Sequence, residues 1–217
     1  MRWLYLHGFA SGPESSKAVM TADHYAAKGL SMERLNLRVP SLEHLRLSAM
    51  IDLTRRSIGG PSDAAVLFGS SLGGITAARV AEADPRVKAV VLLAPAFRFT
   101  ETWEKRLGPA AWADWQRNGL ETEDYAQPGR KTRVDFGFME DARKVESAGP
   151  PRVGVPALIV HGRRDETVDV AVSREWAAGR PNARLIETDD DHGLKASMPL
   201  ILRESDAFLA PFFSDGN

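Results

Sequence analysis

The chain of 217 residues contains no cysteine. This absence excludes a cysteine nucleophile, a disulfide framework and a metal site with thiolate ligands. No apolar run approaches the ~20 residues that a helix needs to cross a bilayer. The N-terminus also has neither the long apolar segment nor the small-residue cleavage site of a signal peptide. From these absences we expect a cytoplasmic protein that does not insert into membranes.

An excess of charge of one sign is also missing. The chain has 28 Lys and Arg against 29 Asp and Glu, which gives a formal net charge of −1. This balance argues against a nucleic-acid partner, because proteins that bind nucleic acid typically carry a basic patch. Hydrophobic residues make up 43% of the chain and charged residues 26%, as in folded globular proteins. We expect a single domain over residues 1–217, with one insertion.

What the chain does contain is a series of short apolar runs that alternate with helical patterns. The runs predict strands over residues 2–8, 32–39, 64–69, 87–95, 155–162 and 183–188. Apolar residues at helical spacing predict helices over residues 15–29, 42–58, 73–84, 169–179 and 196–210. Continuous apolar strands separated by helices are typical of a parallel sheet that is covered on both faces. The predicted fold class is therefore α/β, with three layers.

Residues 97–152 interrupt this alternation. They contain no buried-strand pattern but hold Trp103, Trp112 and Trp115. We expect a broken helix around these tryptophans and two short strands around Pro128, which begins a Pro-Gly turn. The segment is predicted to form a cap-like insertion over one end of the sheet. Its tryptophans either line an acyl pocket or anchor the cap onto the sheet.

The stretch AAVLFGSSLGG, residues 64–74, contains a G-x-S-x-G pattern between a predicted buried strand and a helix of small residues. In that context the pattern indicates a nucleophile elbow, in which the middle serine stands on a strained turn. Ser71 is that middle residue. Ser70 does not fit, because the position two residues before it would have to be small and is Phe68. A plain turn of glycine and serine is the alternative.

A serine hydroxyl needs a base to take its proton, and the chain has five histidines. His24 and His44 fall within helical patterns, where we expect surface or packing residues. His7 and His161 each precede a glycine at the end of a strand, where we expect them to shape loops near the site. His192 follows the last predicted strand, at the edge where a parallel sheet binds its ligands. It is the predicted base.

The base in turn needs a carboxylate that fixes its tautomer. Asp165 lies shortly after the fifth predicted strand, with enough chain for one helix and one strand before His192. Asp169 is a rival, but it has the position of a helix N-cap. The run of aspartates at 189–191 is also a rival, but it is too close to His192 along the chain to reach the far ring nitrogen easily. Asp165 is therefore the predicted partner.

Two backbone N–H groups are expected to form the oxyanion hole. The first belongs to Leu72, directly after the proposed nucleophile. The second belongs to the loop HGFASG after the first strand, at Phe9 or, as second choice, at Ala10. We also expect His7 and Ala10 to border the substrate pocket, together with the three tryptophans of the insertion. The alternative is that this stretch only connects a strand to a helix.

These motifs occur in an order that resembles the α/β-hydrolase superfamily. YLHGFASGPESSK and GSSLGG look like the small bacterial YqiA/YcfP-type esterases, and the resemblance covers nearly the whole chain. It implies that Ser71, Asp165 and His192 form a catalytic triad that uses no cofactor. It also implies that the two leading strands of the superfamily are missing. Six mainly parallel strands would then remain, in the order 4-3-5-6-7-8 of the superfamily's numbering.

From these residues we expect a serine esterase that cleaves short- to medium-chain carboxylic esters, or thioesters, through an acyl-enzyme. No metal site is expected, since the chain has no cysteine and no two histidines four residues apart. Acyl transfer, peptide cleavage and carbon–carbon bond hydrolysis use the same triad and remain open. A non-catalytic binding module that keeps the fold is a further alternative.

Overall fold

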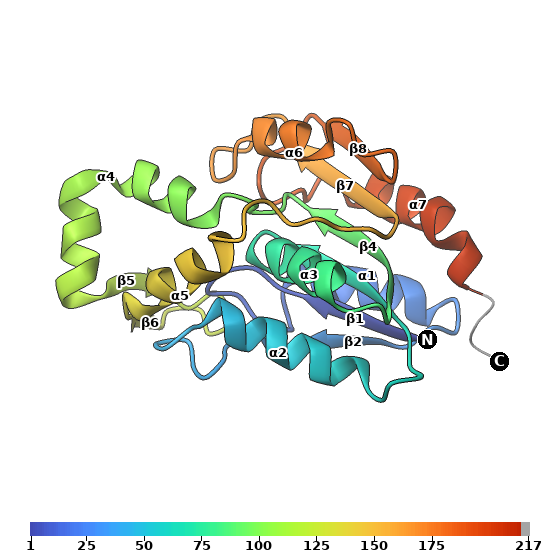
Figure 1. The fold of residues 1–217 in the computed structure, drawn as a ribbon, viewed down its shortest axis with the longest axis horizontal. Helices are drawn as coiled ribbons and strands as arrows, with labels where there is room; N and C mark the ends of the chain where they lie inside the picture. Colours follow the sequence, from blue (N-terminus) through green and yellow to red (C-terminus); the bar gives the residue numbers. More distant parts are fainter. Residues whose placement is uncertain (214–217) are drawn as a thin grey trace.

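The computed structural model describes residues 1–213, and residues 214–217 of the expected domain lie outside the described part (Figure 1). Its centre is a sheet of six parallel strands, as predicted. The strands are β1 Arg2–Leu6, β2 Met32–Leu35, β3 Ala65–Ser70, β4 Val87–Leu93, β7 Ala157–Gly162 and β8 Ala183–Thr188. Their order, β2-β1-β3-β4-β7-β8, is the predicted one.

The strand register places the loops that carry the predicted site residues at one edge of the sheet. Leu6 at the end of β1 pairs with Gly69 of β3, and Ser70 pairs with Leu93 of β4. The interior strands β3 and β7 are buried at every position, which explains why they stand out as continuous apolar runs. Because all six strands are parallel, the loops after β1, β3, β7 and β8 leave the sheet at the same end.

Helices cover both faces of the sheet. They are α1 Ser16–Ala26, α2 Leu47–Ile58, α3 Leu72–Ala83, α6 Val170–Ala177, α7 Met198–Leu209 and the short 3-10 helix Ala210–Phe212. α1 and α7 pack on one face, where strand residues such as Tyr5 and Phe68 point. α2, α3 and α6 pack on the other face, against strand residues such as Leu4 and Leu67. The two cores form the three layers that the sequence predicts.

The chain between β4 and β7 projects beyond one end of the sheet (Figure 1). It contains α4 Phe99–Asn118, the antiparallel strands β5 Leu120–Glu123 and β6 Lys131–Val134, and α5 Gly137–Glu146. α4 bends at Gly108, whose backbone is not helical, and Pro109 follows. The broken helix and the two short strands are thus present as predicted. α5 was not predicted, because only three of its ten residues are buried and its apolar pattern is short.

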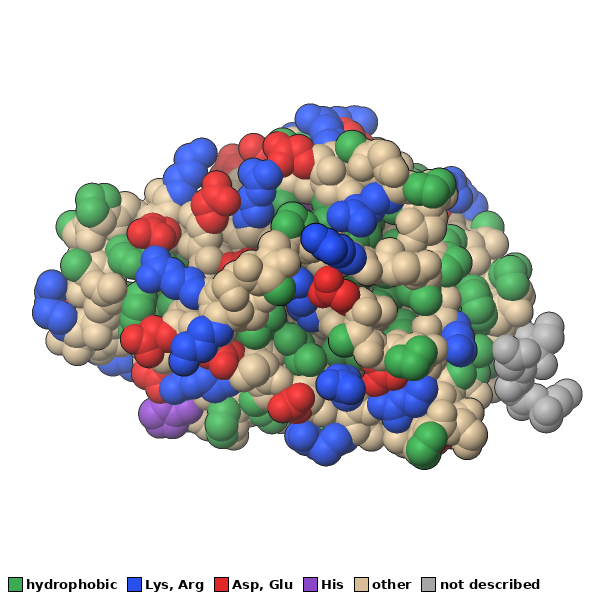
Figure 2. Space-filling model, in the orientation of Figure 1, with side chains coloured by type: hydrophobic (Ala, Val, Ile, Leu, Met, Phe, Trp, Pro, Cys, Tyr) green, Lys and Arg blue, Asp and Glu red, His purple; other side chains and the backbone are tan. Residues whose placement is uncertain are grey.

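One face of the molecule shows no dominance of either charge (Figure 2). Acidic and basic side chains are interspersed on the face seen in Figure 2. Among residues 1–213, no helix combines the length and the low polarity that a membrane crossing requires.

Candidate active site

Ser71 lies at the turn between β3 and α3. Its backbone has φ 54° and ψ −112°, a conformation that is strained for a residue with a side chain. A Cβ atom on Gly73 would lie 2.1 Å from the carbonyl oxygen of Leu6, and one on Gly69 would lie 2.3 Å from that of Gly73. The glycines therefore provide the clearance that lets the strand turn this sharply into the helix.

Asp165 and His192 come from the loops after β7 and β8. Nδ1 of His192 lies 2.7 Å from Oδ2 of Asp165, so this ring nitrogen is protonated and donates a hydrogen bond to the carboxylate. The other carboxylate oxygen accepts hydrogen bonds from the backbone N–H groups of Thr167 and Val168, each at 2.8 Å. The side chain of Asp165 is fully buried, whereas that of His192 is 26% exposed. The carboxylate is thus fixed on both oxygens behind an accessible ring.

A second histidine contacts the same carboxylate. Nε2 of His161 lies 3.1 Å from Oδ2 of Asp165 and 2.9 Å from the carbonyl oxygen of Val168. Burial alone raises the pKa of Asp165, but hydrogen bonds from His161 and His192 outweigh it and hold the pKa well below its usual range. The carboxylate therefore stays ionised. No sequence signal predicts the His161 contact, because it depends on how the loop after β7 bends.

The rival carboxylates have other partners. Asp169 accepts a hydrogen bond from the amide of Ala171 at 2.8 Å and caps α6, as its position predicted. Asp190 is buried and accepts hydrogen bonds from the amide and the hydroxyl of Ser197. Within residues 1–213, Asp165 is the carboxylate that contacts the ring of His192.

Two further histidines, His24 and His44, pair with carboxylates elsewhere. His24 lies 2.9 Å from Asp206 of α7, and His44 lies 2.5 Å from Asp135. In the described part of the chain, no three His, Asp or Glu side chains are grouped so as to hold a metal ion.

A pocket of about 530 Å³ opens beside the turn that carries Ser71. Ser71, His192 and Phe9 all line it, and Asp165 lies behind His192 rather than on its wall. The proposed nucleophile and base therefore face the same cavity. Its volume is in the range of small-molecule sites.

Leu72 and Phe9 are the residues whose backbone N–H groups the sequence predicts for the oxyanion hole. Leu72 is the first residue of α3, so its N–H has no acceptor within the helix. Phe9 follows β1, and among residues 1–213 its N–H donates to no backbone carbonyl. The loop that carries Phe9 passes close to the serine, since a Cβ atom on Gly8 would lie 3.5 Å from Cβ of Ser71.

His7 and Ala10 do not border this pocket, contrary to the expectation from the sequence. The Nδ1–H of His7 donates to the carbonyl of Gly8 at 2.9 Å, and its Nε2 accepts from the N–H of Leu37 at 3.0 Å. Burial lowers the pKa of His7. The neutral ring of His7 therefore supports the loop after β1 from inside the protein. Ala10 in the same loop is also buried and has φ 53°.

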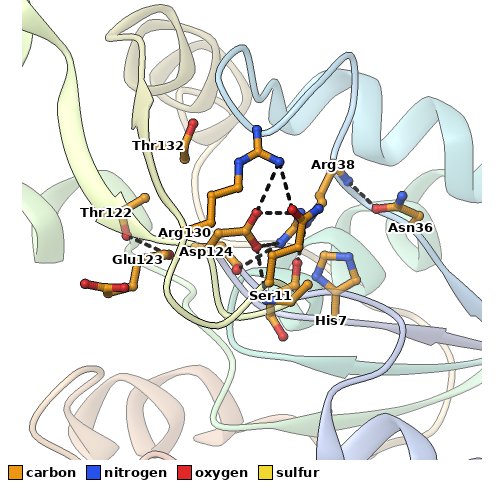
Figure 3. A network of polar contacts seen from close by, with 12 residues as sticks. His7, Ser11, Asn36, Arg38, Thr122, Glu123, Asp124, Arg130 and Thr132 are labelled. Carbon is orange, nitrogen blue, oxygen red and sulfur yellow. Dashed lines mark hydrogen bonds and ion pairs between the residues drawn. The ribbon is translucent and has the colours of Figure 1, made fainter.

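An ion pair ties this loop to the cap (Figure 3). Arg38, in the loop after β2, donates through Nε to the carbonyl of Ser11 at 2.8 Å and through both terminal nitrogens to Asp124. Asp124 lies between β5 and β6 with its side chain fully buried, and Arg38 holds its pKa below the usual range. The N–H of Tyr125 donates to the carbonyl of Ala10 at 3.0 Å. Because 86 residues separate Arg38 from Asp124, no local pattern predicts the pair.

Only one of the three tryptophans of the insertion lines the pocket among the described residues. That residue is Trp103, which packs against Phe9 with ring centroids 5.2 Å apart. Trp112 and Trp115 are 6% and 1% exposed, and the indole N–H of Trp115 donates to the carbonyl of Val134 in β6 at 2.9 Å. The expectation of three pocket tryptophans is therefore corrected: Trp115 joins α4 to β6, and Trp112 packs against Trp115 and Phe136.

Lys17 is a pocket residue that the sequence analysis did not single out. It lies in α1 and lines the cavity. Its Nζ donates to the carbonyl of His192 at 3.3 Å and to that of Gly193 at 3.0 Å. Lys17 thus holds the loop that carries the proposed base. The only feature of the sequence that points to Lys17 is its position shortly after the HGFASG loop.

The family model described as "Uncharacterised protein family (UPF0227)" matches residues 2–208. The chain belongs to the UPF0227 family. The predicted resemblance to YqiA-like proteins is thereby confirmed. A comparison of this UPF0227 member with curated proteins gives no match.

Solved structures share its architecture. Mouse alpha/beta hydrolase domain-containing protein 10 is 21% identical, with 96% of this chain and 89% of that chain covered and a TM-score of 0.77. Est1E from Butyrivibrio proteoclasticus, solved with ferulic acid bound, is 21% identical, with 96% and 87% covered and a TM-score of 0.77. The esterase domain of a Rhodothermus marinus protein is 20% identical, with 97% and 86% covered and a TM-score of 0.65. This UPF0227 member therefore has the α/β-hydrolase fold, as predicted.

Proposed function

We propose that the chain is a serine esterase that hydrolyses short- to medium-chain carboxylic esters or thioesters. The observation that carries the proposal is the Asp165–His192 hydrogen bond beside a pocket that Ser71 also lines. An ionised, buried carboxylate and a strained serine at a helix N-terminus support the same reading. The fold shared with Est1E and with the Rhodothermus esterase domain adds support at the level of architecture.

The acylation step follows from the tautomer of His192. Because Nδ1 donates to Asp165, Nε2 is left to accept the hydroxyl proton of Ser71 as its Oγ attacks the ester carbonyl. The N–H groups of Phe9 and Leu72 stabilise the oxyanion of the tetrahedral intermediate. Nε2–H of His192 then protonates the departing alcohol oxygen, the bond to it breaks, and the acyl group stays on Ser71.

Hydrolysis completes the cycle. His192 takes a proton from a water molecule, whose oxygen attacks the acyl carbon within the same oxyanion site. The bond to Ser71 breaks as His192 returns the proton to Oγ, and the free acid leaves. One ester and one water thus give one alcohol and one acid, and the enzyme is unchanged.

The aromatic part of the pocket wall suits an apolar acyl group. Phe9 and Trp103 are in edge-to-face contact, and Phe99 lies beside Trp103 with ring centroids 6.2 Å apart. All three line the cavity. Because a buried methylene group contributes ~0.8 kcal/mol, such a wall favours acyl chains long enough to reach it.

The test is the hydrolysis of 4-nitrophenyl esters from acetate to octanoate by the wild type, Ser71→Ala and Ser70→Ala. Ser71→Ala should lower kcat at least about a thousandfold, while Ser70→Ala, which changes the neighbouring hydroxyl, should keep most of the activity. Equal amounts of acid and nitrophenol exclude transfer to an acceptor. Equal activity of Ser71→Ala and the wild type would refute the proposal.

A further inference from the structure

The charged side chains on the pocket wall are all of one sign. Lys17, Arg106 and Lys195 line the cavity, and no Asp or Glu is among its lining residues in the described part of the chain. The chain as a whole has 28 basic and 29 acidic residues, and both signs are mixed on the face seen in Figure 2. The pocket is therefore a local departure from an otherwise balanced protein.

Two of these cations flank the proposed base. Lys17 donates to the carbonyls of His192 and Gly193, and Lys195 lies three residues after His192 on the same loop. Within residues 1–213, neither lysine has a carboxylate within 4.0 Å. The Asp165 side chain nearby is fully buried and is already engaged by His161 and His192.

Burial of the Lys17 ammonium group is the main electrostatic cost at this end of the pocket. Burial lowers the pKa of Lys17, attraction to Asp165, Asp191 and Asp190 partly offsets this effect, and repulsion from Lys195 makes the smallest contribution. An anion that binds both ammonium groups in the pocket would offset the cost of burying Lys17. Of the two lysines, Lys195 is exposed to solvent and Lys17 is partly buried.

The proposed reaction indicates which part of an ester would meet these lysines. His192 must protonate the departing alcohol oxygen, so the alcohol part of the substrate has to lie on the His192 side of the pocket. Arg106, in contrast, belongs to α4 and lies over the ring of Trp103, with 4.4 Å between Cζ and the ring centroid. Arg106 therefore lies with the aromatic wall of the cap rather than with the loop of the base.

We propose that this site prefers esters whose alcohol part carries a carboxylate or phosphate group, which Lys17 and Lys195 bind. The inference rests on the proposed esterase function and adds the class of substrate. Lys195 is the specificity-determining residue, since Lys17 also holds the loop of His192. Ammonium groups form charge-assisted hydrogen bonds with either anion.

The experiment compares 4-carboxyphenyl butyrate with 4-carbamoylphenyl butyrate, two esters of matched size that differ in one negative charge. The wild type should favour the carboxylate in kcat/KM by about tenfold, the effect of one charge-assisted hydrogen bond. The preference should shrink as salt is added, because salt screens exposed charges. A third substrate, 4-phosphonophenyl butyrate, distinguishes a preference for a dianion from one for a carboxylate, and either preference supports the inference.

Two variants locate the effect. Lys195→Gln should remove most of the preference ratio, whereas Lys105→Gln, which removes the same charge from α4 outside the pocket lining, should leave the ratio unchanged.

Phenyl hemiadipate and its neutral amide, assayed with the wild type and Arg106→Gln, test whether a negative charge is instead preferred on the acyl part of the ester. A ratio near one in a wild type that hydrolyses the neutral ester would overturn this inference but not the esterase function. A ratio controlled by Arg106 and not by Lys195 would overturn the assignment to the alcohol side.

Discussion

Oδ2 of Asp165 lies 2.7 Å from Nδ1 of His192, although 27 residues separate the two along the chain. The loops after β7 and β8 bring them together at the edge of the sheet where the Ser71 turn also emerges. His161 contacts the same carboxylate oxygen from inside the protein. The carboxylate thus has a structural partner on one side and the proposed base on the other.

Replacement of Asp165 tests its proposed role. Asp165→Asn should lower kcat for 4-nitrophenyl butyrate by about 10⁴-fold, because the amide N–H₂ group favours the wrong tautomer of His192. The matched control is Asp169→Asn, because asparagine caps a helix as well as aspartate does and kcat should then change less than about twofold. Similar losses in both variants would contradict the assignment.

The lowered pKa of Asp165 predicts a particular acid dependence of stability. A carboxyl group whose pKa is lower in the folded than in the unfolded state stabilises the fold above its unfolded pKa of about 3.9. That contribution is lost as the pH falls toward the folded pKa. The difference in the free energy of unfolding between wild type and Asp165→Asn should therefore be largest near neutral pH and should shrink below about pH 4. Urea denaturation at a series of pH values measures it, and a difference that widens in acid would contradict the hydrogen-bonding account.

The Arg38–Asp124 pair should position the loop that carries Phe9. Asp124→Asn should lower kcat for 4-nitrophenyl butyrate about tenfold with a smaller change in KM, since a displaced oxyanion donor weakens binding of the transition state more than of the substrate.

Arg130→Gln is the control for that prediction. Arg130 lies 3.8 Å from Asp124 and is 49% exposed, so its loss should change kcat less than about twofold. A double-mutant cycle that combines Asp124→Asn with Arg38→Gln should give a coupling of about 1 kcal/mol or more in kcat/KM. Additive effects of the two substitutions would show that the pair does not act as a unit.

The tryptophans of the cap should separate into two kinds. Trp103→Ala should raise KM for octanoate esters several-fold while changing KM for acetate little, because Trp103 lines the pocket. Trp112→Ala should lower the free energy of unfolding by about 3 kcal/mol or more and leave the ratio of the two KM values unchanged. A Trp112→Ala variant with the chain-length profile of Trp103→Ala would contradict this division.

Much of the architecture is predictable from local patterns. The interior strands β3 and β7 are buried on both faces, so they appear as unbroken apolar runs such as residues 157–160. The G-x-S-x-G pattern singles out Ser71 because both glycines are sterically required, Gly69 by the turn itself and Gly73 by the end of the adjacent strand β1. The pairing of Asp165 with His192 follows from two loops that must leave a parallel sheet at the same edge.

Contacts between distant segments are not predictable in this way. Nothing near Arg38 or Asp124 distinguishes them from the many other charged residues, and their pairing exists only once the hairpin folds over the first loop. The tryptophans illustrate the same limit within one helix. The kink at Gly108 lies between Trp103 and Trp112, so helical spacing does not reveal that one faces the pocket and the other the core.

Covalent trapping of the nucleophile tests the central claim most directly. The protein is treated with a fluorophosphonate probe and digested, and the modified residue is located by mass spectrometry. The account predicts one adduct, on Ser71, that disappears in Ser71→Ala and persists in Ser70→Ala. An adduct on another residue, or equal labelling of Ser71→Ala and the wild type, would contradict it.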